Sequence, residues 1–331
     1  MSQAEFDVVA VGNAIIDVLY QAPDSFLAQH GIVKDAMQLI DEARADELTA
    51  LTQGAVIAAG GSAANTVTGV ASFGGRAAYI GKVANDDLGA QFTREFRGVG
   101  VQFDSAARPA PPGTARSIII VAPDGHRSMN TYLGASTMLE PADIDKTLIE
   151  SGAITFLEGY LFDRDEAKAA FVQAAEYAKG AGRKVALTLS DLFCVERHRT
   201  SFKHLVAGHI DILFANESEI LALYETGDLE DALMAAQRDC PTVAVTRSDK
   251  GSVIMANDEM LHVAAEPVAK VVDTTGAGDL YAAGFLFGLA KGRGLAECGK
   301  LASIAAGEVI SHMGPRPEVN LKALAAKAGV L

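Results

Sequence analysis

From residue 141 onward, apolar strand-like runs alternate with longer helix-like stretches, and this alternation limits the folds that the chain can adopt. The pattern predicts strands at 153–157, 184–189, 210–214, 242–246 and 252–256, and helices at 164–180, 216–224, 228–238, 276–292, 295–312 and 319–329. A β-branched run at 7–12 predicts another buried strand near the start. Because strands separated by helices join parallel sheets, we expect an α/β fold with a mainly parallel central sheet and helices on both faces.

Residues 100–134 have a different pattern, in which strands follow one another without helices between them. Pro109, Pro111 and Pro112 interrupt the chain, and strand-like runs at 114–121 and 127–132 then flank a Pro-Asp-Gly turn. This arrangement is typical of a β-hairpin. We therefore expect a small sheet that is separate from the main α/β body.

Residues 273–279 read Asp-Thr-Thr-Gly-Ala-Gly-Asp and open a predicted helix. The free N–H groups of a helix start bind anions, and Gly276, Ala277 and Gly278 have almost no side chain to keep an anion away. The Asp279 carboxylate would repel a bound phosphate, but it suits a general base that takes a proton from an attacking hydroxyl group. The alternative is a glycine-rich helix start in which Asp279 only complements the helix dipole.

Polar side chains also follow predicted strands elsewhere. Asn13 and Asp17 come after the first strand, and Asn216 and Glu219 come after the strand at 210–214. The carboxyl ends of parallel strands meet at the edge where α/β sheets bind ligands, so these side chains are candidates for one crevice. The local alternatives are an Asx turn for the first pair and a capping box for the second, with Asn216 as N-cap and Glu219 at position N3.

The stretch 273–279 resembles the signature of the ribokinase family, also called the PfkB family, of sugar and nucleoside kinases. Two further runs resemble family motifs. Residues 60–65 read Gly-Gly-Ser-Ala-Ala-Asn, with the serine as the expected N-cap of a helix. Residues 246–251 resemble a nucleotide-binding turn, although Ser248 stands where the family has a glycine. The resemblance covers nearly the whole chain and implies a single ribokinase-like kinase domain, 1–331.

The resemblance also implies a role for each candidate residue. Asp279 is the catalytic base, and the amides of Gly276, Ala277 and Gly278 hold the anion. The residues implied in acceptor binding are Asn13, Asp17, Gly60, Gly61, Ser62 and Asn65. Those implied in nucleotide binding are Asn216, Thr246, Gly251 and Gly278, with Glu219 acting on Mg²⁺ through water. The implied cofactors are ATP and Mg²⁺, and the small sheet is the lid over the substrate, built from about 14–42 and 100–134.

The acceptor is less well defined than the reaction. Residues 188–193, Thr-Leu-Ser-Asp-Leu-Phe, resemble the Asn-Leu-Ser-Ala-Pro-Phe stretch of adenosine kinases, from which Thr188 and Asp191 depart. We expect transfer of the γ-phosphate of ATP to a primary hydroxyl of a nucleoside, with adenosine first and free ribose or fructose as the alternative. A nucleoside base needs an apolar wall, for which the candidates are Tyr132, Leu133, Phe162 and Phe193.

A function of another class stays open: a sugar- or nucleotide-binding regulator that kept the fold and lost the reaction. The intact Asp279 and glycine-rich loop argue against it. The net charge of −14 argues against a nucleic-acid partner. No apolar run reaches membrane-spanning length, and the start has neither a basic nor an apolar leader region. We therefore expect a cytoplasmic protein that binds a small molecule, as a monomer or homodimer.

Overall fold

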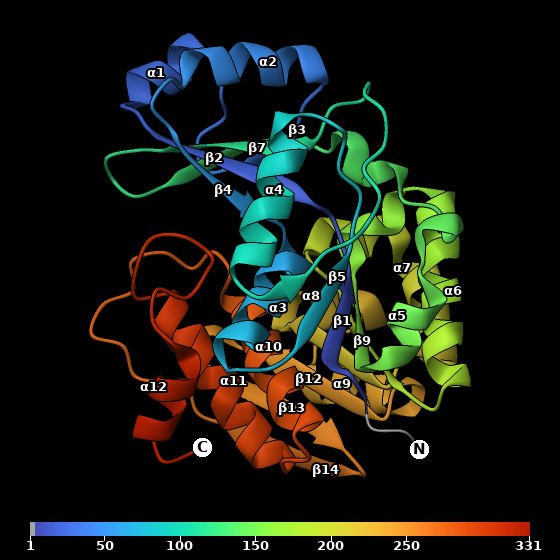
Figure 1. Ribbon diagram of the computed structural model, residues 1–331. Helices are drawn as coiled ribbons and strands as arrows, with labels where there is room; N and C mark the ends of the chain where they lie inside the picture. Colours follow the sequence, from blue (N-terminus) through green and yellow to red (C-terminus); the bar gives the residue numbers. More distant parts are fainter. Residues whose placement is uncertain (1–3) are drawn as a thin grey trace.

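The computed structural model describes residues 4–331. Within these residues, a nine-stranded sheet has the strand order β14-β13-β12-β11-β10-β9-β1-β5-β6 (Figure 1). Its strands are β1 Phe6–Val11, β5 Ala77–Ile80, β6 Val101–Gln102, β9 Gly152–Glu158, β10 Lys184–Thr188, β11 Ile212–Asn216, β12 Thr242–Thr246, β13 Ser252–Ala256 and β14 Glu259–Val263. β13 pairs antiparallel with β12 and β14, and the other neighbouring pairs of the described strands are parallel. The predicted mainly parallel sheet is confirmed.

Helices cover both faces of this sheet. In β1, Val8 and Ala10 belong to one hydrophobic core and Val9 and Val11 to the other, because successive side chains of a strand point to opposite faces. The first core includes the helices α3 Ser62–Ser72, α4 Asp87–Gly98, α10 Ala277–Ala290, α11 Leu295–Val309 and α12 Leu321–Lys327. Those of the second are α5 Lys146–Ser151, α6 Asp165–Gly180, α7 Leu192–His209, α8 Glu217–Tyr224 and α9 Leu229–Asp239. Burial on both faces explains why β1 is apolar from Val8 to Val11.

A second, five-stranded sheet of the described residues lies beyond one end of the large sheet (Figure 1). Its order is β3 Met37–Leu39, β8 Arg127–Tyr132, β7 Ala115–Val121, β2 Ile15–Gln21 and β4 Val56–Gly60. β7 and β8 form the predicted antiparallel hairpin. Helices α1 Asp24–Gln29 and α2 Glu42–Leu51 lie on its outer side, and α2 buries Ala45 and Leu48. We call this unit the small sheet.

The boundaries of the small sheet differ from those expected. β4 belongs to it, because Gly60 pairs with Ile15 of β2, although the expected segments 14–42 and 100–134 do not contain this strand. β6 lies inside 100–134 but pairs with β5 of the large sheet. β14 was not among the predicted strands, since it is an edge strand whose Glu259 and Met260 are exposed. Short 3₁₀ helices occupy Gly134–Met138, Pro141–Asp143, Gly159–Asp163 and Ser248–Lys250.

Candidate active site

A cavity of about 810 Å³ lies between the small sheet and the carboxyl ends of the parallel strands. The large sheet contributes residues at or just after its strand ends, namely Asn13, Glu158, Thr188, Asn216 and Thr246. The small sheet contributes Asp17, Met37, Leu39, Ser117, Ile119, Met129 and Thr131. The loop 274–279 adjoins both sets. The carboxyl edge of the sheet is thus the site where the predicted residues meet, as the topology of an α/β sheet requires.

The start of α10 faces this cavity through Gly276, Ala277 and Gly278. Gly276 is the N-cap with φ 81°, and a Cβ there would lie 2.7 Å from both Cα and O of Pro315, so only glycine fits. A Cβ on Gly278 would meet no atom of the described residues within 4 Å. Among the described residues, no side chain caps the N-terminus of α10. The first backbone N–H groups of the helix are therefore available to an anion in the cavity.

Asp279, in the first turn of α10, is held by two side chains of α3. Ser62 Oγ donates to Asp279 Oδ1 at 2.6 Å, and Asn65 Nδ2 donates to Oδ2 at 3.0 Å. Desolvation in the cavity wall raises the pKa of Asp279 to about 6, and these two hydrogen bonds act in the opposite direction. The carboxylate is therefore ionised at neutral pH, and each oxygen retains a lone pair for a further donor. This is the geometry that a general base needs.

The N-terminus of α3 differs from the expectation at Ser62. Gly61, with φ 104°, is the N-cap, and Ser62 is the first helical residue. A Cβ on Gly61 would lie 2.4 Å from the carbonyl oxygen of Asn13. The Ser62 hydroxyl is consequently free of the capping role and reaches Asp279 instead. Both Gly61 and Ser62 line the cavity.

Glu158, which the sequence analysis does not single out, joins the acceptor side of the cavity. Its Oε1 accepts hydrogen bonds from Asn13 Nδ2 at 2.8 Å and Asn13 N at 3.3 Å, and its Oε2 accepts one from Ala63 N at 2.8 Å. The side chain is 1% exposed, and this burial raises the pKa of Glu158 to about 7. Glu158 ends β9, so the strand-end rule that indicates Asn13 could also have found it.

Asp17 projects from β2 into the cavity. Burial raises the pKa of Asp17 to about 7, while the charges of Arg316 and Arg127 lower it and Asp279 raises it further. Gly60 does not line the cavity. A Cβ on Gly60 would lie 2.2 Å from Asp17 Oδ2, so this glycine makes room for the carboxylate rather than for a ligand.

Asn216 and Glu219 form the capping box that the sequence offered as a local alternative. Asn216 Oδ1 accepts from Glu219 N at 2.9 Å, and the Glu219 carboxylate accepts from Asn216 N at 2.9 Å and from Asn216 Nδ2 at 2.6 Å. Both residues also line the cavity, so the cap and a binding role do not exclude one another. Burial raises the pKa of Glu219 to about 7.

The turn 246–251, for which the sequence suggests nucleotide binding, is only partly at the cavity. Thr246 lines it, whereas Gly251 does not. Gly251 has φ 80°, and a Cβ there would lie 2.0 Å from the carbonyl oxygen of Val263, so this glycine lets β12 and β13 turn against the end of β14. Its glycine character is explained by packing.

Only two of the four candidates for the apolar wall line the cavity. Leu133 and Phe193 line the cavity, and Phe193 is 71% exposed. Phe162 is instead buried in the second core, where its ring stacks on Phe202 at 4.6 Å between centroids. Tyr132 lies outside the lining, with the guanidinium of Arg116 5.7 Å from its ring centroid. Aromatic residues close to a strand end can point into either layer, and sequence does not fix which.

Across residues 4–331, no group of three or more His, Cys, Asp or Glu side chains is arranged to hold a metal ion. The fit of Mg²⁺ therefore depends on water and phosphate ligands, which is how this ion commonly binds. Glu219 is suited to order such water, because each of its oxygens keeps a lone pair beside the cavity. Within the same range, no helix has both the length and the apolar character needed to cross a bilayer.

Comparison with known proteins agrees with this geometry. The family model described as pfkB family carbohydrate kinase matches residues 25–321. The structure of adenosine kinase from Sinorhizobium meliloti has 51% sequence identity and a TM-score of 0.91, and the match covers 98% of this chain and 100% of that chain. A probable sugar kinase from Rhizobium etli CFN 42 has 47% identity and a TM-score of 0.93, over 99% and 100% of the two chains.

A more distant relative is similar over nearly the same length of chain. Adenosine kinase of Saccharomyces cerevisiae is 26% identical over 332 residues, which cover 93% of this chain and 96% of the yeast protein. The resemblance drawn from residues 273–279 is thus confirmed over almost the full length. The chain belongs to the pfkB family of carbohydrate kinases and is a phosphotransferase that acts on a hydroxyl group of a sugar or a nucleoside.

Proposed function

We propose that the protein transfers the γ-phosphate of ATP to the primary hydroxyl group of a nucleoside, with adenosine as the preferred acceptor. One observation carries this proposal: the Asp279 carboxylate lies in the first turn of α10, beside uncapped amides, and is held by Ser62 and Asn65. A base and an anion site thus occupy the same helix start. That combination suits deprotonation of a hydroxyl group next to a phosphoryl group.

In the proposed mechanism, Asp279 takes the proton from the acceptor hydroxyl as that oxygen forms a bond to the γ-phosphorus of ATP. The bond from this phosphorus to the bridging oxygen breaks, and ADP leaves. The amides at Gly276, Ala277 and Gly278 then stabilise the negative charge on the transferring group, as oriented dipoles do in a site that excludes water. Asn216 and Thr246 line the side of the cavity assigned to the nucleotide. Glu219 would order the water around a bound Mg²⁺, and that ion would offset the charge of the phosphates.

The acceptor side has the polar groups that a ribose needs. Asp17 and the amides of Asn13 and Asn65 face the cavity, and a carboxylate at position 17 can accept hydrogen bonds from two vicinal hydroxyl groups. Gly61 and Ser62 bring the start of α3 next to the same region. A free sugar such as ribose or fructose would satisfy these groups equally well.

The apolar lining favours a nucleoside over a free sugar. Met37, Leu39, Ile119, Met129 and Leu133 come from the small sheet and its continuation, and they provide a surface on which a purine can pack. A free sugar would leave this surface without a partner. The 51% identity to the adenosine kinase of Sinorhizobium meliloti supports adenosine in particular.

The small sheet is proposed to act as a lid. Phosphoryl transfer to a sugar hydroxyl must exclude water, since water would otherwise be the acceptor. We place the reaction in the cytoplasm and expect a monomer or homodimer.

A coupled assay of ADP release over a panel of nucleosides and sugars tests the proposal. Adenosine should give the highest kcat/KM, a free sugar in first place would favour the alternative, and no ADP release with any acceptor would indicate a silent binding protein.

A further inference from the structure

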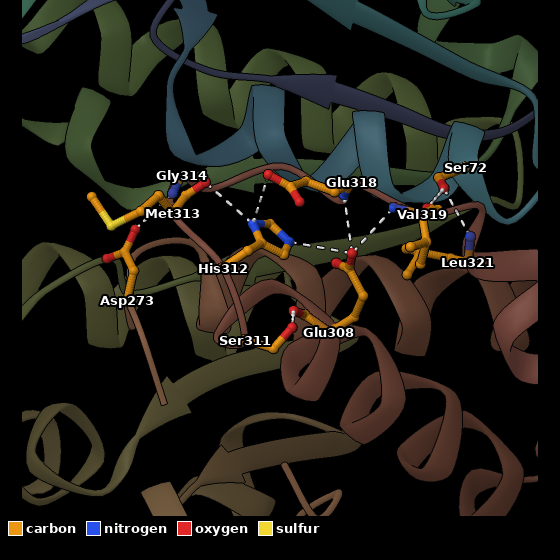
Figure 2. Close-up of polar contacts among 10 residues, drawn as sticks. All are labelled: Ser72, Asp273, Glu308, Ser311, His312, Met313, Gly314, Glu318, Val319 and Leu321. Carbon is orange, nitrogen blue, oxygen red and sulfur yellow. Dashed lines mark hydrogen bonds and ion pairs between the residues drawn. The ribbon is translucent and has the colours of Figure 1, made fainter. Parts of the chain in front are cut away.

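The segment between α11 and α12, whose Pro315 lines the cavity, is fixed at two points (Figure 2). Glu308 Oε1, at the end of α11, accepts hydrogen bonds from Glu318 N at 3.0 Å and Val319 N at 3.2 Å. Gly314 N donates to Asp273 Oδ2 at 2.8 Å, which ties the segment to the loop before α10. The backbone between these points is therefore held in one place, although it belongs to no helix or strand.

Arg316 lies between these two points and reaches toward α3. Its Nε donates to Asn65 Oδ1 at 3.4 Å, and its guanidinium lies 5.3 Å from the centroid of the Phe96 ring. Arg316 Nη2 is shielded from solvent and has no hydrogen-bond partner among the described residues. Arg316 does not line the cavity, whereas its neighbour Pro315 does. Any effect of Arg316 on the reaction must therefore pass through another residue.

Asn65 connects Arg316 to the catalytic base. Its amide oxygen accepts from Arg316, and its amide nitrogen donates to Asp279 Oδ2. Reversing the amide would place its oxygen against the Asp279 carboxylate and its NH₂ group against the guanidinium, so both contacts would become repulsive. The positive charge on one side and the negative charge on the other therefore select a single orientation of the Asn65 amide.

We propose that Arg316 is a positioning residue for the phosphoryl transfer, because it fixes the Asn65 amide so that this amide donates to Asp279. The effect on turnover rests on the proposed function, whereas the hydrogen bonds that link Arg316, Asn65 and Asp279 are present in the free protein. Without Arg316, the Asn65 amide is free to turn, and Asp279 loses one of its two side-chain donors. A carboxylate with fewer donors holds its proton more tightly.

Other ionisable groups face these residues and must be considered. The Arg316 guanidinium is subject to the charges of Asp17 on β2 and Glu95 on α4, and it also lies near the phenol of Tyr79 on β5, which is neutral at ordinary pH because burial raises its pKa. Arg316 in turn lowers the pKa of Asp17. Loss of Arg316 should consequently also raise the KM for the acceptor through Asp17, whereas kcat at saturating acceptor reports the path through Asn65 to Asp279.

The direct test follows the titration of Asp279 by ¹³C NMR of labelled aspartate carboxyl groups in the free protein, with Asp279→Asn to assign the signal. Arg316→Met keeps an unbranched, largely aliphatic side chain but removes the guanidinium, and with it the charge, the donor and the contact with the Phe96 ring. The Asp279 pKa should rise by about one unit, the order expected for losing a hydrogen bond to a charged group. This readout does not need turnover, so it tests the inference even if the proposed reaction is wrong.

A double-mutant cycle separates positioning from general disruption. In an Asn65→Ala background, Arg316→Met should cause no further shift of the Asp279 pKa, because the connecting amide is gone. In an active enzyme, the acidic limb of the kcat profile should follow the same pattern. An absent shift in the single variant, or an equal shift in both backgrounds, would overturn the inference.

Lys291→Met is the matched control. Lys291 also lies over a phenylalanine, with Nζ 5.6 Å from the Phe287 centroid, and pairs with the buried Asp7 at 2.8 Å. This pair is at the start of β1, the opposite end of that strand from the cavity. The control should lower stability and leave the Asp279 titration unchanged. A similar shift in both variants would show that Arg316 has only a structural role.

Discussion

Arg127 of β8 and Asp273, in the loop before α10, form a buried ion pair with an Nη2–Oδ2 distance of 2.5 Å. Their side chains are 9% and 5% exposed, respectively. Asp273 also accepts hydrogen bonds from Thr275 N at 3.0 Å and Gly314 N at 2.8 Å. One carboxylate therefore joins the hairpin of the small sheet to the loop that leads into α10, where the proposed anion-binding amides lie.

This pair leads to a prediction about the proposed lid. In the free protein, the amides of 115–132 should exchange faster than those of β9 and β11, because lids are drawn from the less stable parts of a fold. Adding the acceptor should slow their exchange, while ATP alone should have little effect. In Arg127→Met, exchange in the hairpin of the free protein should become faster still, because Asp273 loses its counterion.

Hydrogen exchange read by mass spectrometry measures these differences. Arg97→Met is the control, since Arg97 pairs with Asp104 in a largely exposed ion pair and such pairs contribute little. If the hairpin is as protected as the central strands in the free protein and does not respond to the acceptor, it is a fixed part of the core and not a lid.

The second prediction concerns the base. In Asp279→Asn, the acceptor should still bind, and kcat should fall by roughly 10²–10⁴, the usual contribution of a general base. Asp87→Asn changes the same residue type in the first turn of α4, away from the cavity, and should leave kcat unchanged. Isothermal titration and steady-state kinetics on both variants measure the two effects. A kcat close to normal in Asp279→Asn would exclude it as the base.

Asp17 provides the third prediction. At pH 8, above the pKa of about 7 that burial gives Asp17, this side chain is ionised. In Asp17→Ala at this pH, the acceptor hydroxyls lose a charged partner worth about 1.5–3 kcal/mol, so the KM for the acceptor should rise roughly 10–150-fold. The KM for ATP should stay nearly constant. Asp46→Ala removes an exposed carboxylate of α2 and should change neither constant. Equal changes in both KM values would show that Asp17 has a structural role.

The fourth prediction concerns pH and Glu158, whose pKa is raised by burial from 4.5 to about 7. The folded protein retains this proton where the unfolded chain has lost it. The resulting stabilisation is complete below about pH 4.5 and disappears as the pH rises through 7. Gln at this position does not titrate. The free energy of unfolding of the wild type, relative to Glu158→Gln, should therefore fall by about 2 kcal/mol between pH 5 and pH 8.

Chemical denaturation of both proteins at the two pH values gives this difference. The comparison uses the change with pH rather than the absolute loss, because Gln also places an NH₂ group near the donors of Asn13 or Ala63. A difference that is constant, or that grows with pH, would contradict the assigned ionisation of Glu158.

Much of the fold could be predicted from sequence because its signals are local. The apolar strands and intervening helices of the large sheet are continuous segments with the expected periodicity, and the hairpin at 115–132 has its own turn. The place of β4 could not be predicted in this way. Its partner is β2, and nothing in the residues between them indicates whether β4 joins the large or the small sheet.

Some residues of the candidate site could likewise be predicted from sequence, and others could not. Asn13 follows β1 and Asn216 ends β11, so the strand-end rule indicates both, whereas Asp17 reaches the cavity from inside β2 of the small sheet. Arg316 contacts Asn65 across 251 positions of the chain, through a segment without regular structure, and no local pattern indicates such a contact. Gly60 and Gly251 show a further limit, because a glycine that makes room for a neighbouring chain looks the same in sequence as one that makes room for a ligand.

One measurement tests both the identity of the acceptor and the role of Asp279 directly. Initial rates of ADP release should be measured with ATP, Mg²⁺ and either adenosine, other nucleosides, ribose or fructose, and repeated with Asp279→Asn. The account predicts the highest kcat/KM with adenosine and a loss of turnover with every acceptor in the variant. A free sugar that outperforms all nucleosides, or ADP release that persists without Asp279, would contradict it.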